Sequence, residues 1–252
     1  MSVRTFVLIV LVLTALIGIP SGAAAQSPRW AVDFENGAVF SWYNDVRIPG
    51  DTGTTFSLTD DLTSDTTYFW RVRVDFRVAK KHVLSGLAAP LEIHSSGSFN
   101  RPVSFAGETF APGVMVTGRY MFNSYRFTYR YEFLDKGGWR FGIGVTGKVR
   151  DAATTLTATG TYAEKLNVGF VPLVNFKLER DLGKKAVFRF EGDALAAPQG
   201  RAEDIFVGIL VPLNRNITIK AGYRMLEGGA DNDEVYTFAG FHYAAVGAII
   251  RF

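Results

Sequence analysis

The chain of 252 residues contains no cysteine. This absence excludes a disulfide scaffold, a thiolate metal site, a cysteine nucleophile and a lipid anchor on an N-terminal cysteine. The chain also has little excess charge of either sign: its formal net charge is only +3, and the charged residues are spread along the sequence. We therefore expect no nucleic-acid partner. A hydrophobic fraction of 48% and an aromatic fraction of 14% exclude a disordered chain.

The first 25 residues have the pattern of a secretory signal peptide. Arg4 supplies the positive charge, residues 6–19 form an apolar run, and Ala23, Ala24 and Ala25 provide the small-residue cleavage site. The apolar run is shorter than the roughly 20 residues of a membrane-spanning helix. We therefore predict a cleaved signal peptide over residues 1–25 and a single domain over residues 26–252.

Strict alternation of apolar and polar residues runs through the rest of the chain. Residues 68–78 are an example, since Val72, Val74 and Phe76 alternate with Arg73, Asp75 and Arg77. Successive side chains of a β-strand point to opposite faces, so each such run predicts a strand with one apolar and one polar face. The predicted strands cover residues 30–43, 67–80, 82–93, 113–133, 139–150, 165–178, 185–196, 204–213, 216–226 and 236–252.

Two architectures share this pattern: a soluble barrel or sandwich with its apolar face inside, and a transmembrane barrel with its apolar face towards lipid. The apolar face carries too many large rings for the interior of a small barrel, and the polar face is rich in glycine and charge. Short and long connections also alternate, with long ones predicted at 44–65, 95–112, 151–165, 197–204 and 227–234. These features favour the transmembrane barrel.

The last ten residues, Tyr243 to Phe252, form an alternating strand that ends on phenylalanine. This ending resembles the C-terminal β-signal of bacterial outer-membrane β-barrel proteins, in which the terminal Phe is read by the assembly machinery. The resemblance covers the whole mature sequence and implies an all-β, antiparallel up-and-down barrel in the bacterial outer membrane. It also implies outer-membrane lipids, lipopolysaccharide and the barrel assembly machinery as partners, with Phe252 as the assembly signal.

We expect ten strands, because both termini of such barrels usually lie on the periplasmic side. The apolar face changes parity within residues 113–133, and a β-bulge at Asn123 and Ser124 would explain the change. A turn at that point would give eleven strands, an additional strand over 95–110 would give twelve, and eight is a further alternative.

The polar face predicts a lumen filled with charge that must pair, since an isolated charge away from water is costly. We expect Arg71, Arg73 and Arg77 to form a plug with those of Asp33, Glu35 and Glu92 that lie on adjacent strands. The predicted lumen network comprises Arg71, Arg73, Asp75, Arg77, Arg126, Arg130, Glu132, Arg140, Lys148, Arg189, Glu191, Asp193, Lys220 and Arg224. Basic residues exceed acidic ones on this face, so any leak should favour anions.

Candidates for chemistry are few. His82, His94 and His242 are expected to be structural, with a bulge near Ala244 turning His242 into the lumen, and His94 lies beside Ser95 without an acid to orient it. No cofactor is expected, although Asp231, Asp233 and Glu234 offer carboxylates that suit a loop calcium ion. The sequence thus favours a non-enzymatic barrel with a structural or loop-mediated role. The alternatives are a narrow, porin-like anion-favouring pore and an outer-membrane enzyme acting on lipid or peptide.

Overall fold

The structure is a computed structural model that describes residues 28–198 and 200–252; the predicted signal peptide lies outside this part of the chain. Its strands are β1 (Trp30–Arg47), β2 (Phe56–Ser57), β3 (Leu62–Ser64), β4 (Thr67–Ala79), β5 (His82–Ala89), β6 (Glu92–Ser98), β7 (Val103–Phe105), β8 (Glu108–Phe110), β9 (Met115–Lys136), β10 (Trp139–Ala158), β11 (Thr161–Leu182), β12 (Ala186–Ala197), β13 (Gly200–Pro212), β14 (Ile217–Asp231) and β15 (Tyr236–Arg251). Among these residues no helix is long and apolar enough to span a membrane.

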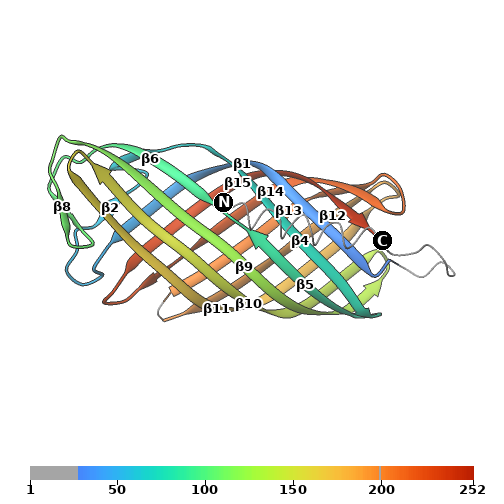
Figure 1. Ribbon diagram of the computed structural model, residues 1–252. Coiled ribbons are helices and arrows are strands. Elements are labelled where there is room, and N and C mark those ends of the chain that lie inside the picture. Colours follow the sequence, from blue (N-terminus) through green and yellow to red (C-terminus); the bar gives the residue numbers. More distant parts are fainter. Residues whose placement is uncertain (1–27, 199) are drawn as a thin grey trace.

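The strands close into an antiparallel barrel of ten strands (Figure 1). β5 and β6 share one position in the wall, since both pair with β9, and the sheet closes through the β9–β10 and β15–β1 pairs. Backbone hydrogen bonds of 3.0 Å in both directions between Trp30 and Phe252 extend the β15–β1 seam to the C-terminus. The predicted fold and strand number are confirmed.

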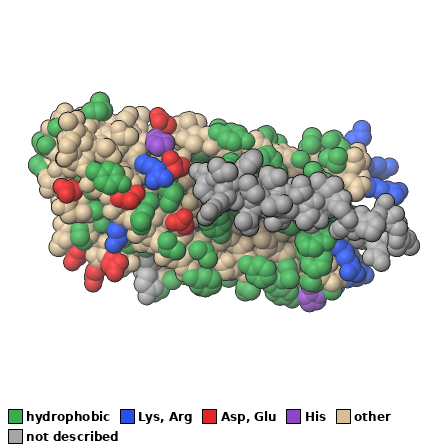
Figure 2. Space-filling model, in the orientation of Figure 1, with side chains coloured by type: hydrophobic (Ala, Val, Ile, Leu, Met, Phe, Trp, Pro, Cys, Tyr) green, Lys and Arg blue, Asp and Glu red, His purple; other side chains and the backbone are tan. Residues whose placement is uncertain are grey.

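The two ends of the barrel differ. The short turns and the C-terminus lie at one end, and the two long connections that carry β2, β3, β7 and β8 lie at the other, which we call the loop end (Figure 1). On the face shown in Figure 2, Lys and Arg gather at the short-turn end, whereas Asp and Glu gather towards the loop end. The strands are longer than predicted at the loop end. Residues 151–165, predicted as a loop, instead continue β10 and β11 around a tight turn at Gly160.

The predicted bulge at Asn123 and Ser124 is wrong. The β9–β10 register runs without interruption from Val116↔Ala158 to Glu132↔Gly142, so even-numbered residues of β9 face inwards throughout. The parity change arises because the barrel interior changes character. Towards the short-turn end the interior is polar and the exterior apolar, whereas towards the loop end Tyr120 is buried inside and Arg119 lies on the outside. The only register shift in this pair falls between Phe141 and Gly142, near the short-turn end.

The outer surface carries an apolar belt. The strongly exposed apolar side chains on it include Phe34, Phe40, Trp42, Tyr68, Tyr125, Phe127, Trp139, Ile143, Val145, Val168, Phe170, Val174, Val207, Ile209, Ile219, Tyr223, Val246 and Ile250. On β9 and β10 the belt ends where Asn123 donates a hydrogen bond of 3.2 Å to Asp151. An apolar belt of this kind around a barrel is the lipid-facing surface of a transmembrane barrel.

The long connections pack into an apolar cap at the loop end. Phe56 contacts Phe99 and Phe105 with ring centroids 5.5 Å apart in both pairs. Arg101 clamps Asp61 with two hydrogen bonds, of 2.8 and 2.9 Å, one to each carboxylate oxygen. The hydrogen bonds from Arg101, supported by the backbone N–H of Ser57, hold the pKa of Asp61 below its ordinary value. This ion pair therefore ties the two connections together.

One seam of the wall is incomplete. β11 pairs with β12 only from Val174↔Ala194 to Leu182↔Ala186. Residues 161–173 of β11 continue towards the loop end paired with β10 alone. The β12–β13 hairpin reverses between Ala197 and Gly200, well short of the β10–β11 hairpin (Figure 1). The barrel wall thus has a gap between β11 and β12, with one side formed by an unpaired strand edge.

Candidate functional site

An ion-pair network fills the barrel interior from its middle towards the short-turn end. Every residue of the predicted lumen network except Lys148 makes an ion pair there. Alternation accounts for this placement, because the charged residues occupy the inward positions of strands whose outward positions are apolar. Around Arg71, Arg126 and Asp204, in the middle of the lumen, the free space consists of voids of about 20 and 10 Å³, whereas cavities of about 230 and 750 Å³ lie among Arg77, Glu132 and Arg140 towards the short-turn end. The two voids in the middle of the lumen are close to the size of one water molecule, so the network is tightest there.

The network spans the lumen rather than following its wall. On β4, Arg73 Nη2 lies 2.8 Å from Glu191 Oε1 on β12, half-way round the ten-stranded barrel, and 3.0 Å from Asp33 Oδ2 on the adjacent β1. Lys220 Nζ on β14 lies 2.8 Å from Glu35 Oε2 on β1. Charge-assisted bonds such as Arg73–Glu191 and Arg126–Asp204 thus cross the lumen, whereas Lys220–Glu35 links strands separated by β15 alone.

Asp204 is the centre of the network. Its carboxylate oxygens lie 2.6 Å from Arg126, 2.6 Å from Arg224 and 2.9 Å from Arg71, which come from three different strands. The sequence analysis missed this residue, because residues 197–204 were predicted as a loop. The run Ile205 to Val211 is apolar at nearly every position, so it gives no alternation from which the inward face could be read.

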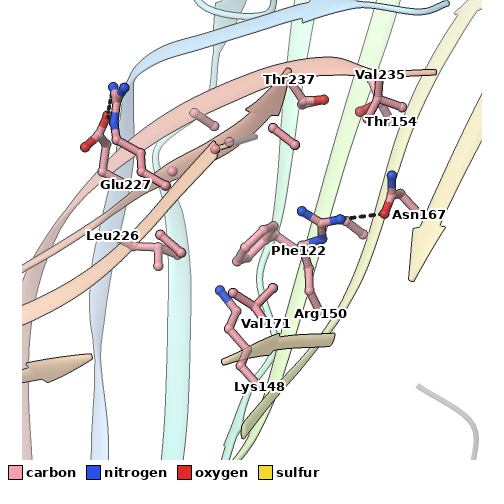
Figure 3. Close-up of a pocket in the computed structure, with 18 of the residues that line it drawn as sticks. Phe122, Lys148, Arg150, Thr154, Asn167, Val171, Leu226, Glu227, Val235 and Thr237 are labelled. Carbon is pink, nitrogen blue, oxygen red and sulfur yellow. Dashed lines mark hydrogen bonds and ion pairs between the residues drawn. The ribbon is translucent and has the colours of Figure 1, made fainter. Parts of the chain in front are cut away.

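A cavity of about 360 Å³ lies on the loop-end side of the network. Small and apolar side chains such as Val171, Leu195 and Leu226 form most of its walls. Figure 3 shows Lys148 and Arg150 side by side in this cavity, with Leu226 opposite them and Arg150 hydrogen-bonded to Asn167 at 2.5 Å. Lys148, predicted in the ion network, instead belongs to this cavity. The volume of the cavity lies within the range of small-molecule pockets.

No protein-family model and no curated protein matches this sequence. Among solved structures, the outer membrane protease OmpT from Escherichia coli matches with a TM-score of 0.53, covering 92% of this chain and 99% of that one at 7% identity. This chain has the fold of a bacterial outer-membrane β-barrel. The translocator domain of the autotransporter NalP from Neisseria meningitidis matches with a TM-score of 0.45 at 11% identity, covering 99% of this chain and 96% of that one. That likeness is too loose to add to the argument, and at these identities only the fold is shared.

Glu92, predicted in the lumen, lies on the outside of the barrel. It forms an ion pair with Arg119 at 2.7 Å, and its Oε1 lies within hydrogen-bond distance of His94 Nε2, at 3.1 Å. The prediction failed because the polar face was assumed to point inwards everywhere, whereas towards the loop end it points outwards. The hydrogen bond from Arg119 lowers the pKa of Glu92, and the barrel presents a charged surface at this height.

The histidines also lie apart from the lumen network. His242 stays on the outer face between Phe40 and Trp42, because the β14–β15 register is continuous and the predicted bulge near Ala244 is absent. His82 Nδ1 lies 2.8 Å from the hydroxyl of Tyr129. Ser95, the sequence neighbour of His94, is buried inside and hydrogen-bonds to Ser64, so this serine and histidine are not paired.

The loop carboxylates of Asp231, Asp233 and Glu234 are not gathered into a site. In the described part of the chain, no group of three or more His, Cys, Asp and Glu side chains is placed to hold a metal ion. The turn is built instead around Asn232, whose side-chain oxygen accepts hydrogen bonds of 3.0 Å from the backbone N–H groups of Glu234 and Val235.

Proposed function

We propose that this protein is an integral protein of the bacterial outer membrane whose barrel does not act as a general pore. The observation that carries the proposal is the network that spans the lumen, in which Arg73 reaches Glu191 on the opposite wall. The apolar belt supports insertion among lipids and lipopolysaccharide. The N-terminal pattern supports export through a cleaved signal peptide, and the C-terminal pattern supports insertion by the barrel assembly machinery.

We propose a non-enzymatic role, in which the protein binds a partner or ligand without changing it chemically. The three histidines contact Tyr129, Glu92 and Tyr223 on the outer face. General acid–base work needs a titratable group within hydrogen-bond reach of a bound substrate. The internal cavity offers Lys148 and Arg150, which are cations suited to holding an anion rather than to cleaving a bond. The fold is shared with a protease, but at an identity that transfers no chemistry.

Conductance in a planar lipid bilayer tests the plug. We expect the unaltered protein to pass no current or only a small, anion-favouring one, because the voids in the middle of the lumen are near the size of a single water molecule. Replacing Arg73 and Arg77 with Ser should open or widen the conductance, since Arg73 bridges Asp33 and Glu191, and Arg77 pairs with Glu132.

The matched control replaces Lys184 and Lys185 with Ser in the short β11–β12 turn, away from the network, and should leave the conductance unchanged. A large, steady, cation-selective current from the unaltered protein would overturn both the occlusion and the sign of the selectivity.

A further inference from the structure

The gap between β11 and β12 extends into the apolar belt. The belt ends on β10 at Asp151, whose ladder partner on β11 is Val168. Pairing of β11 with β12 starts only at Val174, so residues 169–173 form an unpaired edge at the height of the belt. Phe170 on this edge is 70% exposed, the largest exposure among the large apolar side chains. The gap therefore faces lipid on the loop-end side of the membrane.

The sequence of this edge suits a strand without a partner. Pro172 has no N–H to donate, and proline within sheets is confined to edge strands, strand starts and bulges. Unpaired backbone is costly against hydrocarbon and is tolerated at membrane depth where it lines a cavity. Opposite the edge, β12 ends in Ala194, Leu195, Ala196 and Ala197, of which three have very small side chains. The gap is thus bordered on one side by a strand edge that lacks one donor and on the other by mostly small side chains.

The internal cavity opens into this gap. Its lining includes inward residues such as Val171 and Leu195, but also Phe170 and Pro172, which lie on the outward-facing positions of β11. A space lined from both faces of the same strand must pass round the edge of that strand. The cavity of about 360 Å³ is therefore continuous with the lipid-facing surface.

The cavity carries uncompensated positive charge. Lys148 is 3% exposed, and its Nζ lies 4.6 Å from the ring centroid of Phe122 and forms no ion pair among the described residues; Asp193 and Asp204 act on it only from a greater distance. Arg150 bonds the neutral Asn167, and its Nε is buried without a partner in that same part of the chain. Glu227 is the one acidic residue of the described lining, and it is held by Arg201 and Tyr43, pointing away from the cavity (Figure 3).

We propose that this cavity binds a single-headed anionic amphiphile that enters sideways from the membrane through the β11–β12 gap. The acidic head, a carboxylate or a phosphate monoester, pairs with Lys148 and Arg150, and the apolar body lies along Val171, Leu195 and Leu226. The volume suits about a dozen non-hydrogen atoms, since a cavity of about 150 Å³ holds benzene. A bound anion supplies the counter-charge that a buried cation requires. This site goes beyond the proposed function. It depends on the ion network only because the network closes the cavity on its short-turn side.

Binding of decanoate to the full mature protein in phosphatidylcholine nanodiscs tests the head site. We expect one decanoate per barrel, and affinities at least about tenfold lower for decanol and decyltrimethylammonium, because a charge-assisted bond is worth more than a neutral one. Decyl phosphate distinguishes the two acidic heads, and binding of either above decanol supports the site. Lys148→Met and Arg150→Met should each weaken decanoate binding about tenfold, whereas Lys184→Met, in the distant turn, should not. Equal binding of decanoate and decanol, or unchanged binding by folded Lys148→Met and Arg150→Met proteins, would overturn the site.

A second pair of variants tests the lateral route. Ala196→Trp places a large ring at the rim of the gap and should slow association of decanoate at least about tenfold if the gap is the route. Ala221→Trp adds the same ring to the outer face of β14, whose neighbours are paired on both sides, and should leave the rate unchanged. Heat-modifiable gel mobility reports whether each variant is folded. Unchanged association in a folded Ala196→Trp protein would overturn the lateral route. Both readouts are independent of conductance, so they distinguish this proposal from the failure of the plug.

Discussion

Arg126 Nη2 on β9 lies 2.6 Å from Asp204 Oδ2 on β13, across the lumen of the barrel. Arg71 and Arg224 share the same carboxylate, so one acidic side chain balances cations from three strands. Removing one partner of a buried ion pair costs more free energy of folding than the intact pair contributes, because the remaining charges stay buried without a counter-charge. The positions of Arg71, Arg126 and Arg224 therefore depend on Asp204.

Asp204→Asn should lower the free energy of unfolding by about 3–5 kcal/mol, the cost of breaking a buried pair. The measurement is urea unfolding in lipid vesicles, followed by tryptophan fluorescence. Asp181→Asn is the matched control, since Asp181 pairs with Arg140 near the exposed short-turn end and should cost at most about 1 kcal/mol. Equal losses from the two variants would show that Asp204 is no more central than a surface partner.

The lipid-facing assignment can be tested one face at a time. Val74 lies in the outward row of β4 between Val32 on β1 and Gly86 on β5. Val74→Arg should cost about 2–4 kcal/mol in a bilayer, because it places a charge against lipid. Thr117→Arg, on the exposed outer face of β9 near the loop end, should cost almost nothing. Arg73→Val should instead disturb the lumen. If Val74→Arg and Thr117→Arg were equally tolerated, in a protein that purifies without detergent, the transmembrane reading would fail.

Alternation predicted the fold and the number of strands because it is a local property of each strand. It did not predict how far the strands extend. Tyr120 and Arg126 both face inwards, yet one is apolar and the other charged, since the interior changes from apolar cap to ion network between them. A reading that assumes one polarity per face must then insert a bulge at Asn123, which the continuous register excludes.

The cavity and the β11–β12 gap could not be predicted from the sequence for a different reason. Lys148 alternates as regularly as its neighbours, and only the positions of acidic residues on distant strands leave it without a partner. The incomplete β11–β12 seam depends on the unequal lengths of two hairpins. Pro172 was the one local signal of an edge, because proline disfavours a central strand.

The Asp61–Arg101 pair predicts an acid-sensitive loop cap. The pKa of Asp61 is held below its ordinary value of 3.8, so the ionised carboxylate stabilises the folded cap above that pH. This contribution is lost as the pH falls from 3.8 through the lowered value. The effect should be at most about 1 kcal/mol, because the pair is partly exposed.

Hydrogen exchange of residues 54–64 and 99–105 measures it. The protection factors, which are corrected for the intrinsic pH dependence of amide exchange, should fall below pH 4 in the unaltered protein. At neutral pH they should be up to about fivefold lower in Arg101→Gln than in the unaltered protein. Arg119→Gln, which breaks a pair on the outer wall, should leave the exchange of the cap unchanged. A cap whose exchange in Arg101→Gln matches the unaltered protein at neutral pH would contradict this role.

Phe252 provides the last prediction. Its backbone closes the β15–β1 seam through two hydrogen bonds of 3.0 Å with Trp30, and its ring is 42% exposed at the short-turn end. The backbone role survives a side-chain change, so Phe252→Ala removes only the ring that the assembly machinery is expected to read. We expect a lower yield in the outer membrane and chain retained in the periplasm, with recovery in Phe252→Trp. The purified Phe252→Ala protein should refold in detergent as well as the unaltered chain, which separates recognition from stability. Normal insertion of Phe252→Ala in cells would mean that the terminal ring has no recognition role.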